Sequence, residues 1–143
     1  MGRGAQEAKL PYQFDFDPKH QIIRGRFAGR ITDEELKASY QEALAHGKNT
    51  RVLAGLADFS KASASEVSQA VVLELARMEP ALADPKAVRV IVATLPGLFG
   101  MARVFELHGE RTRPNLHVVR SQEEAWAILG VWNPKFEALA QRS

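Results

Sequence analysis

The stretch RVLAGLAD, residues 51–58, decides the fold of this 143-residue chain. Between Arg51 and Asp58 every residue is apolar or glycine, and residues 87–94, AVRVIVAT, have almost the same character. A shorter run, LHVV, follows at residues 116–119. Continuous apolar runs of strand length are typical of parallel strands that helices cover on both faces. The three runs therefore predict the centre of a parallel sheet.

Segments with helical periodicity separate these runs. Apolar residues recur at helical spacing after Asp33, between residues 66 and 79, between residues 98 and 109, and after Ser121. Thr32 with Glu35, and Ser121 with Glu124, have the spacing of capping boxes, in which a hydroxyl and a carboxylate satisfy free backbone donors at a helix start. Strands that alternate with helices predict an α/β fold with a mostly parallel sheet.

Two alternating segments precede the first helix. Residues 12–17 and 22–28 separate apolar from polar side chains, and residues 18–20 break the pattern between them. They predict a hairpin whose first strand is the antiparallel edge of the sheet. We expect a single α/β domain, with a mixed, mostly parallel sheet of four or five strands and about four flanking helices. The domain is predicted at residues 11–131, after a flexible lead at 1–10 and before a tail or short helix at 132–143.

The composition excludes several classes of protein. The chain contains no cysteine, which excludes a disulfide scaffold, a thiolate nucleophile and an iron–sulfur cluster. Its 19 Lys and Arg residues are interleaved with 17 Asp and Glu residues, whereas nucleic-acid interfaces concentrate basic residues on one face. No apolar run approaches the ~18 residues of a membrane span, and residues 1–10 lack the apolar core of a signal sequence. We therefore expect a cytoplasmic protein that has no transmembrane segment and binds no nucleic acid.

A candidate binding rim lies beyond the carboxyl ends of the predicted strands. Ligands of open parallel sheets bind at this edge, where loops lead into helices. Polar and glycine residues collect in the loops expected there. The candidate binding residues are Arg30, Asp58, Ser60, Ser63, Ser65, Pro96, Leu98, Phe99, Gly100 and Arg103.

Ser63 and Ser65 are expected where the second helix opens. Free backbone donors and hydroxyls at such a place can hold a small anion or accept a phosphoryl group. The alternative is that one of the two serines only caps the helix, and that Asp58 is a turn residue at the end of its strand.

The segment at residues 96–103, PGLFGMAR, is unusually apolar for the junction of a loop and a helix. Gly97 and Gly100 permit a close approach of the backbone, and Leu98 and Phe99 are candidates for lining a pocket or docking a second subunit. The alternative is an ordinary buried helix start, with Arg103 in a surface ion pair with a nearby glutamate. Leu98, Phe99, Trp132 and Phe136 together suggest exposed apolar surface and self-association, most simply as a homodimer.

Motifs of the common chemistries are absent from the sequence. The four histidines have no HxxxH spacing, no serine lies in a GxSxG context, and no phosphate-binding loop of the GxxxxGK or GxGxxG type occurs. The sequence therefore predicts no catalytic residue, metal site or cofactor.

Several stretches of local sequence resemble the SpoIIAA-like family, which is related to the STAS domains of sulfate transporters and anti-sigma factor antagonists. They are GRIT at residues 29–32, Asp58 after the middle strand, FGMARVF at 99–105, and EAW at 124–126 with Leu129. The resemblance covers residues 12–131. It implies a sheet of four or five strands flanked by helices, no demonstrated enzymatic activity, and a role in partner regulation or ligand binding. The related CRAL-TRIO-like lipid-binding domains imply an apolar ligand as an alternative.

In the antagonists, the helix after the middle strand begins with Asp-Ser-Ser-Gly, whose serine is phosphorylated. The corresponding stretch here, SASE at residues 63–66, lacks the Asp and the Gly and adds negative charge at Glu66. Three hypotheses follow. The first is a non-catalytic STAS-like domain that binds a protein partner or a small anionic or apolar ligand at the rim. The second is a carrier of a small apolar or amphiphilic ligand. The third is an enzyme that uses Asp58 with Ser63 or Arg103.

Overall fold

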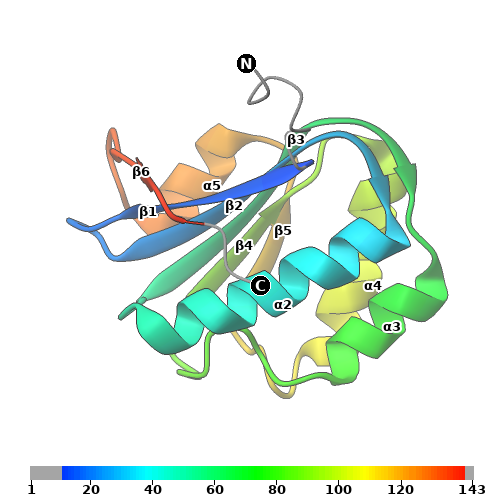
Figure 1. The fold of residues 1–143 in the computed structure, drawn as a ribbon, viewed down its shortest axis with the longest axis horizontal. Coiled ribbons are helices and arrows are strands. Elements are labelled where there is room, and N and C mark those ends of the chain that lie inside the picture. The colour runs from blue at the N-terminus through cyan, green and yellow to red at the C-terminus, as the bar shows by residue number, and fades with distance from the viewer. Residues whose placement is uncertain (1–10, 141–143) are drawn as a thin grey trace, which may run out of the picture.

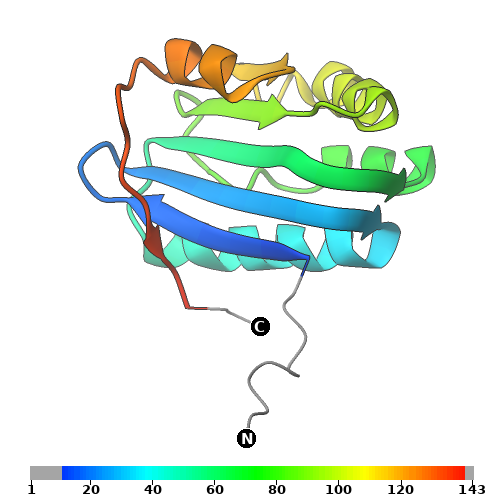
Figure 2. The ribbon, with the colours of Figure 1, turned by 90° about the horizontal axis from the view of Figure 1, so that it is seen from above.

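The computed structural model describes residues 11–140, so the flexible lead predicted at residues 1–10 lies outside the described residues. The described chain folds around one six-stranded sheet with the order β5-β4-β3-β2-β1-β6. The strands are β1 (Tyr12–Asp17), β2 (Ile22–Thr32), β3 (Ala54–Glu66), β4 (Val88–Val92), β5 (Leu116–Val119) and β6 (Glu137–Ala138). Figure 2 shows the sheet face on, with the strands in this order.

The strand directions confirm the predicted topology. Strands β2, β3, β4 and β5 are parallel to one another, and β1 is antiparallel to β2. Beyond β1 the sheet gains only the two-residue β6, which pairs antiparallel with Asp15 and Phe16. The five longer strands are the ones that the sequence predicts.

β3 is longer than the sequence predicts, because its second half pairs with β2 alone. The pairing of β3 with β4 ends at Asp58 and Val92, whereas the pairing with β2 continues to Glu66. Beyond Asp58 this strand therefore lies at an edge, where exposed polar residues are tolerated. Two register shifts in the β2–β3 pair, between Arg26 and Ala28 and between Gly29 and Arg30, each place one extra residue in β3 and let the long pair bend.

Four helices cover the sheet within the described residues. They are α2 (Asp33–Asn49), α3 (Gln69–Arg77), α4 (Pro96–Gly109) and α5 (Gln122–Leu129). Figures 1 and 2 show α2 and α3 on one side of the sheet, and the larger core cluster on that side includes Leu98 of α4. α5 covers the other face, where Ala125 packs against Leu56, Val90 and Val92 in a separate, smaller cluster. The sheet therefore separates two cores.

The register sorts the side chains between these two faces. Neighbouring residues in adjacent strands point to the same side of a sheet. Gly25, Ala57 and Ile91 form one row across the sheet and face α2, α3 and α4. Arg26, Asp58, Val92 and Val119 form the next row, on the side of α5. The residues that follow each other in β3 thus serve different cores.

Candidate functional site

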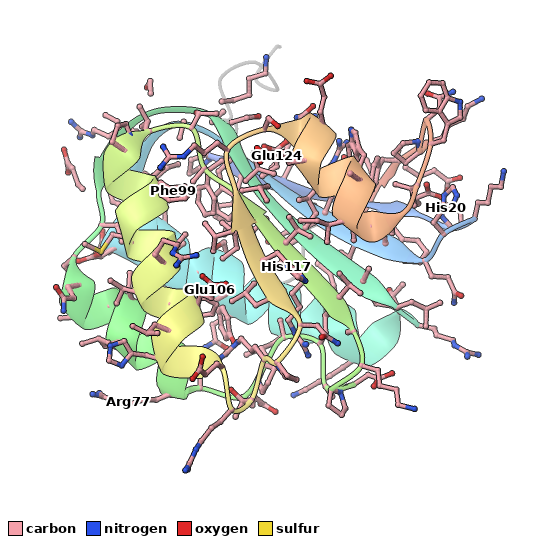
Figure 3. All side chains as sticks on the ribbon, turned by 180° about the vertical axis from the view of Figure 1, so that it is seen from behind. His20, Arg77, Phe99, Glu106, His117 and Glu124 are labelled. Atoms are coloured by element: carbon pink, nitrogen blue, oxygen red, sulfur yellow. The ribbon has the colours of Figure 1, made fainter. Side chains whose placement is uncertain are left out.

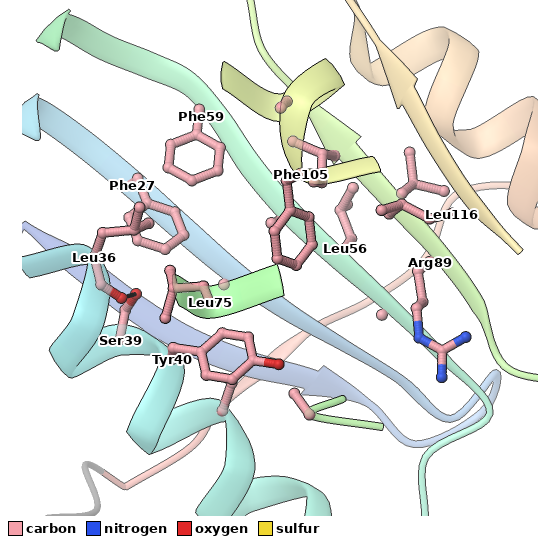
Figure 4. Close-up of a pocket in the computed structure, with 18 of the residues that line it drawn as sticks. Phe27, Leu36, Ser39, Tyr40, Leu56, Phe59, Leu75, Arg89, Phe105 and Leu116 are labelled. Carbon is pink, nitrogen blue, oxygen red and sulfur yellow. Dashed lines mark hydrogen bonds between the residues drawn. The ribbon is translucent and has the colours of Figure 1, made fainter. Parts of the chain in front are cut away.

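A cavity of about 210 Å³ lies between the sheet and helices α2, α3 and α4. The sheet and the helices both contribute lining residues, and most of the lining surface is apolar. Figure 4 shows aromatic and aliphatic side chains that surround it, among them Phe27, Phe59, Leu36, Leu75, Phe105 and Leu116.

Small residues of β2 and β3 form the floor of the cavity. Gly25, Gly55 and Ala57 are neighbours on the sheet and line the cavity. A Cβ atom on Gly25 would lie 3.0 Å from Cε2 of Phe14, and one on Gly55 would lie 2.9 Å from Cδ1 of Leu82. The glycines therefore make room for the side chains of Phe14 and Leu82, which lie close against their backbone and help to line the cavity.

Stacked aromatic rings close one end of the cavity. The rings of Phe27 and Phe59 have centroids 4.2 Å apart and an interplanar angle of 14°. Both side chains are buried in the larger core. Because two flat rings in contact pack rigidly, this end gives a fixed apolar wall.

The other end of the cavity is polar and positively charged. Arg89 of β4 and Arg113, in the loop before β5, line it with side chains that are only 7% and 3% exposed. Tyr40 of α2 lies beside them and accepts a hydrogen bond of 2.6 Å from Nη2 of Arg113. Figure 4 shows Arg89 at the end of the cavity opposite to Phe27 and Phe59. The arrangement is an elongated apolar space with a cationic end.

The structure brings Asp58 and Ser60 together, on the α5 side of the sheet. The Asp58 carboxylate is 3% exposed and accepts hydrogen bonds from the backbone N–H of Ser60 at 2.9 Å and from Nε2 of Gln122 at 2.6 Å. Gln122 is the first residue of α5. Asp58 thus joins β3 to the start of α5 and does not line the cavity.

Ser63 and Ser65 lie in β3 and not at a helix start, so this prediction was wrong. Ser68 is the N-cap of α3, and its hydroxyl accepts a hydrogen bond from the N–H of Val71. Ser63 is exposed, and the hydroxyl of Ser65 accepts a hydrogen bond from the N–H of Val67. The reason is the continued pairing with β2, which keeps residues 59–66 extended.

Arg30 and Arg103 are both exposed and both in ion pairs. Arg30 lies 3.2 Å from Glu66, two residues beyond its paired residue in β3, and Arg103 lies 2.9 Å from Glu106 on α4. No described hydrogen bond or ion pair joins Asp58, Ser63 and Arg103 to one another. Arg103 thus makes a surface ion pair with a nearby glutamate, which was the alternative interpretation of this residue from the sequence.

The segment at residues 96–103 begins α4, with Pro96 at its first position. Leu98 is buried and lines the cavity, and Phe99 lies under the guanidinium of Arg120 at 3.8 Å. A Cβ atom on Gly97 or Gly100 would meet open space, so neither glycine is needed for a close approach within this chain. Figure 3 shows Phe99 and Glu124 near one end of the molecule and His20 away from them.

Two absences concern the described residues 11–140 alone. None of their helices has both the length and the apolar character needed to cross a membrane. Their His, Asp and Glu side chains form no group that could hold a metal ion.

The topology and the helices on both faces define the class: the chain has a SpoIIAA/STAS-like fold. A solved structure of the anti-sigma factor antagonist SpoIIAA in its unphosphorylated form is similar to it with a TM-score of 0.53 and 14% sequence identity. The likeness covers 85% of this chain and 99% of that chain. At this identity it shows the fold alone. Comparisons with protein-family models and with curated protein sequences find no match.

Proposed function

We propose that the protein is a non-catalytic ligand-binding domain that holds a small apolar or amphiphilic molecule in the cavity between the sheet and α2, α3 and α4. The observation that carries the proposal is the cavity itself. Protein interiors are close-packed, and few of their voids exceed a water molecule. A volume of about 210 Å³ is large by this standard.

The energetics favour an occupant. A fully enclosed empty cavity costs about 24 cal/mol per Å³, so a space of 210 Å³ corresponds to at most about 5 kcal/mol. Net stabilities of domains are about 5–15 kcal/mol, so this cost is a considerable share of the total. A ligand that fills the space recovers part of it, which supplies a driving force for binding.

The volume limits the size of the ligand. A cavity of about 150 Å³ lined by Leu, Ile and Phe takes up benzene. A space of about 210 Å³ suits a ligand of about ten non-hydrogen atoms, such as 1-octanol. A lipid with two long acyl chains exceeds this volume.

Calorimetric titration with 1-octanol tests the proposal. We expect saturable binding and a melting temperature that rises with ligand concentration. Ala57→Leu places a larger side chain in the cavity and should abolish both effects. Ala127→Leu is the matched control, because Ala127 is exposed on α5 and lies outside the cavity lining. Absence of binding to the unmodified protein, or equal binding to Ala57→Leu, would contradict the proposal.

A second candidate function is the regulation of a protein partner through the rim. It is supported by the exposed hydroxyl of Ser63 on the β3 extension, and by the fold shared with a protein named as an anti-sigma factor antagonist. We expect Ser63→Asp, which mimics phosphate, and Ser63→Ala to differ in the proteins that they crosslink in cells. Identical crosslinking profiles would count against this function.

The proposal includes a cytoplasmic location and a homodimer. Of the four apolar residues considered for self-association, Leu98 is buried, while Phe99 and Phe136 lie against Arg120 and Arg24. Trp132 is 90% exposed and is the residue that supports an apolar contact between two copies. Light scattering on the protein and on Trp132→Ser tests this part: a monomer in both cases refutes it.

A further inference from the structure

The charged residues of the cavity lining all have the same sign. Among the described residues that line it, Arg89 and Arg113 are the charged ones, and neither Asp nor Glu takes part. The two arginines come from different elements, β4 and the loop after α4. Both are buried, and no described ion pair includes either of them.

The hydrogen-bond acceptors of the two guanidinium groups are all neutral. Arg89 donates to the backbone oxygens of Leu82 at 2.6 Å, Ala87 at 2.9 Å and Asp84 at 3.0 Å. Arg113 donates to three backbone oxygens at the end of α3 and to the hydroxyls of Tyr40 and Thr112. Carbonyl and hydroxyl oxygens satisfy N–H donors and carry only partial negative charge, so neither guanidinium has a full counter-charge among these bonds. The Nε–H group of each arginine takes part in none of these bonds.

Burying a charge without a counter-ion is costly. Burial is the main reason why the pKa of Arg89 lies below its ordinary value, and the positive charge of Arg113 lowers it further, while the nearby Asp84 and Tyr40 act in the opposite direction without reversing the shift. Because a guanidinium nevertheless stays protonated in proteins, the two like charges remain at this end of the cavity. An anion placed there would relieve the repulsion and would gain charge-assisted hydrogen bonds.

We propose that the cavity selects a carboxylate with a short apolar body, bound with its carboxylate at Arg89 and Arg113 and its body toward Phe27 and Phe59. This inference rests on the proposed function and adds the chemical class of the ligand. The apolar lining, the cationic end and the volume together define a medium-chain monocarboxylate such as octanoate. Both arginines also hold the segment between α3 and β4 through its carbonyl groups. That structural role alone gives no preference for one head group over another.

Three probes with the same eight-carbon alkyl chain distinguish anion recognition from a purely structural role of the arginines. They are octanoate, 1-octanol and octylammonium, each titrated calorimetrically at neutral pH. We expect octanoate to bind roughly tenfold or more tightly than 1-octanol, because hydrogen bonds to charged partners are the stronger ones. Octylammonium should bind more weakly than both. Equal affinity for octanoate and 1-octanol overturns the inference and leaves the proposed function in place. Binding of none of the three overturns both.

Variants of Arg89 test the assignment to this residue. Arg89→Gln removes one of the two charges and keeps N–H donors for the carbonyls, so the preference for octanoate over 1-octanol should shrink by severalfold, with Arg113 alone supplying the remaining charge. Arg89→Lys keeps the charge and should retain a preference for octanoate. Arg103→Gln is the matched control, because Arg103 is exposed and lies outside the cavity lining. An unchanged preference in a folded Arg89→Gln overturns the role of Arg89. If that variant does not fold, the three-probe comparison on the unmodified protein decides.

Discussion

The buried pair of Glu42 and His46 in α2 should make the protein less stable than an apolar pair would. Nε2 of His46 lies 3.1 Å from Oε2 of Glu42, and the side chains are only 1% and 5% exposed. The other polar atoms, Oε1 of Glu42 and Nδ1 of His46, have no hydrogen-bond partner among the described residues. The His46 ring lies against Phe14, with centroids 5.2 Å apart. One hydrogen bond therefore serves two fully desolvated polar groups.

The expected change in the free energy of unfolding follows from these two atoms without hydrogen-bond partners. Each buried polar atom without a partner costs about 1–3 kcal/mol, and replacing a buried ion pair by apolar residues of similar volume gains about 1–4 kcal/mol. We expect the double variant Glu42→Met/His46→Leu to raise the free energy of unfolding by about 2 kcal/mol. His46→Leu alone should lower it by about 3 kcal/mol, because it leaves the carboxyl group of Glu42 buried without a partner.

Urea unfolding of the wild type, both single variants and the double variant measures the pair as a double-mutant cycle. The exposed pair of Arg103 and Glu106 provides the control: Glu106→Gln should change stability by less than about 1 kcal/mol. A double variant less stable than the wild type would refute the reasoning. So would a neutral His46→Leu, because it would mean that Glu42 finds another partner.

Two further predictions concern the hairpin and the start of α2. Burial would raise the pKa of Asp17, but hydrogen bonds from the His20 side chain and from the backbone of His20 and Lys19 hold it below the ordinary value of 3.8. A carboxyl group whose pKa is lowered by folding stabilises the folded protein at pH values above its ordinary pKa. This stabilisation is lost as the pH falls through the folded pKa. Asp17→Asn should therefore lower stability at neutral pH and approach the wild type in strong acid; urea unfolding at a series of pH values checks this, and a pH-independent difference contradicts it. Thr32→Ala removes one half of a reciprocal capping box with Glu35 and should cost about 1 kcal/mol in thermal unfolding, whereas an unchanged melting temperature would contradict that role.

The sheet could be predicted because its centre depends on local composition. The runs that begin near Val52, Val88 and Leu116 are apolar enough to be buried on both faces, and they form three adjacent parallel strands. The capping box of Thr32 and Glu35 marks the start of α2 in the same local way. The second half of β3 could not be predicted, since residues 60–66 are mostly polar and are a strand because they pair with β2.

The candidate site depends on contacts between distant parts of the chain. The carboxylate of Asp58 bonds to Gln122, which is 64 residues away, and Arg113 bonds to Leu75, Ala76 and Met78. No local pattern indicates these partners. Arg89 did leave a signal, because it is the only charged residue in the apolar run at residues 87–94. A single arginine in a buried strand must find acceptors or an anion inside the protein.

Successive residues of β3 point to opposite faces of the sheet, so the residues that line the cavity and the residues that contact α5 alternate along this strand. Gly55 and Ala57 line the cavity, whereas the carboxylate of Asp58 bonds to Gln122 of α5 on the other face. A ligand in the cavity therefore contacts the same strand that carries Ser63 on its exposed extension. A shift of β3 by one residue would exchange these faces and would place Asp58 among apolar side chains. The register thus keeps the cavity free of negative charge, and this is the condition under which two buried arginines can attract an anionic ligand.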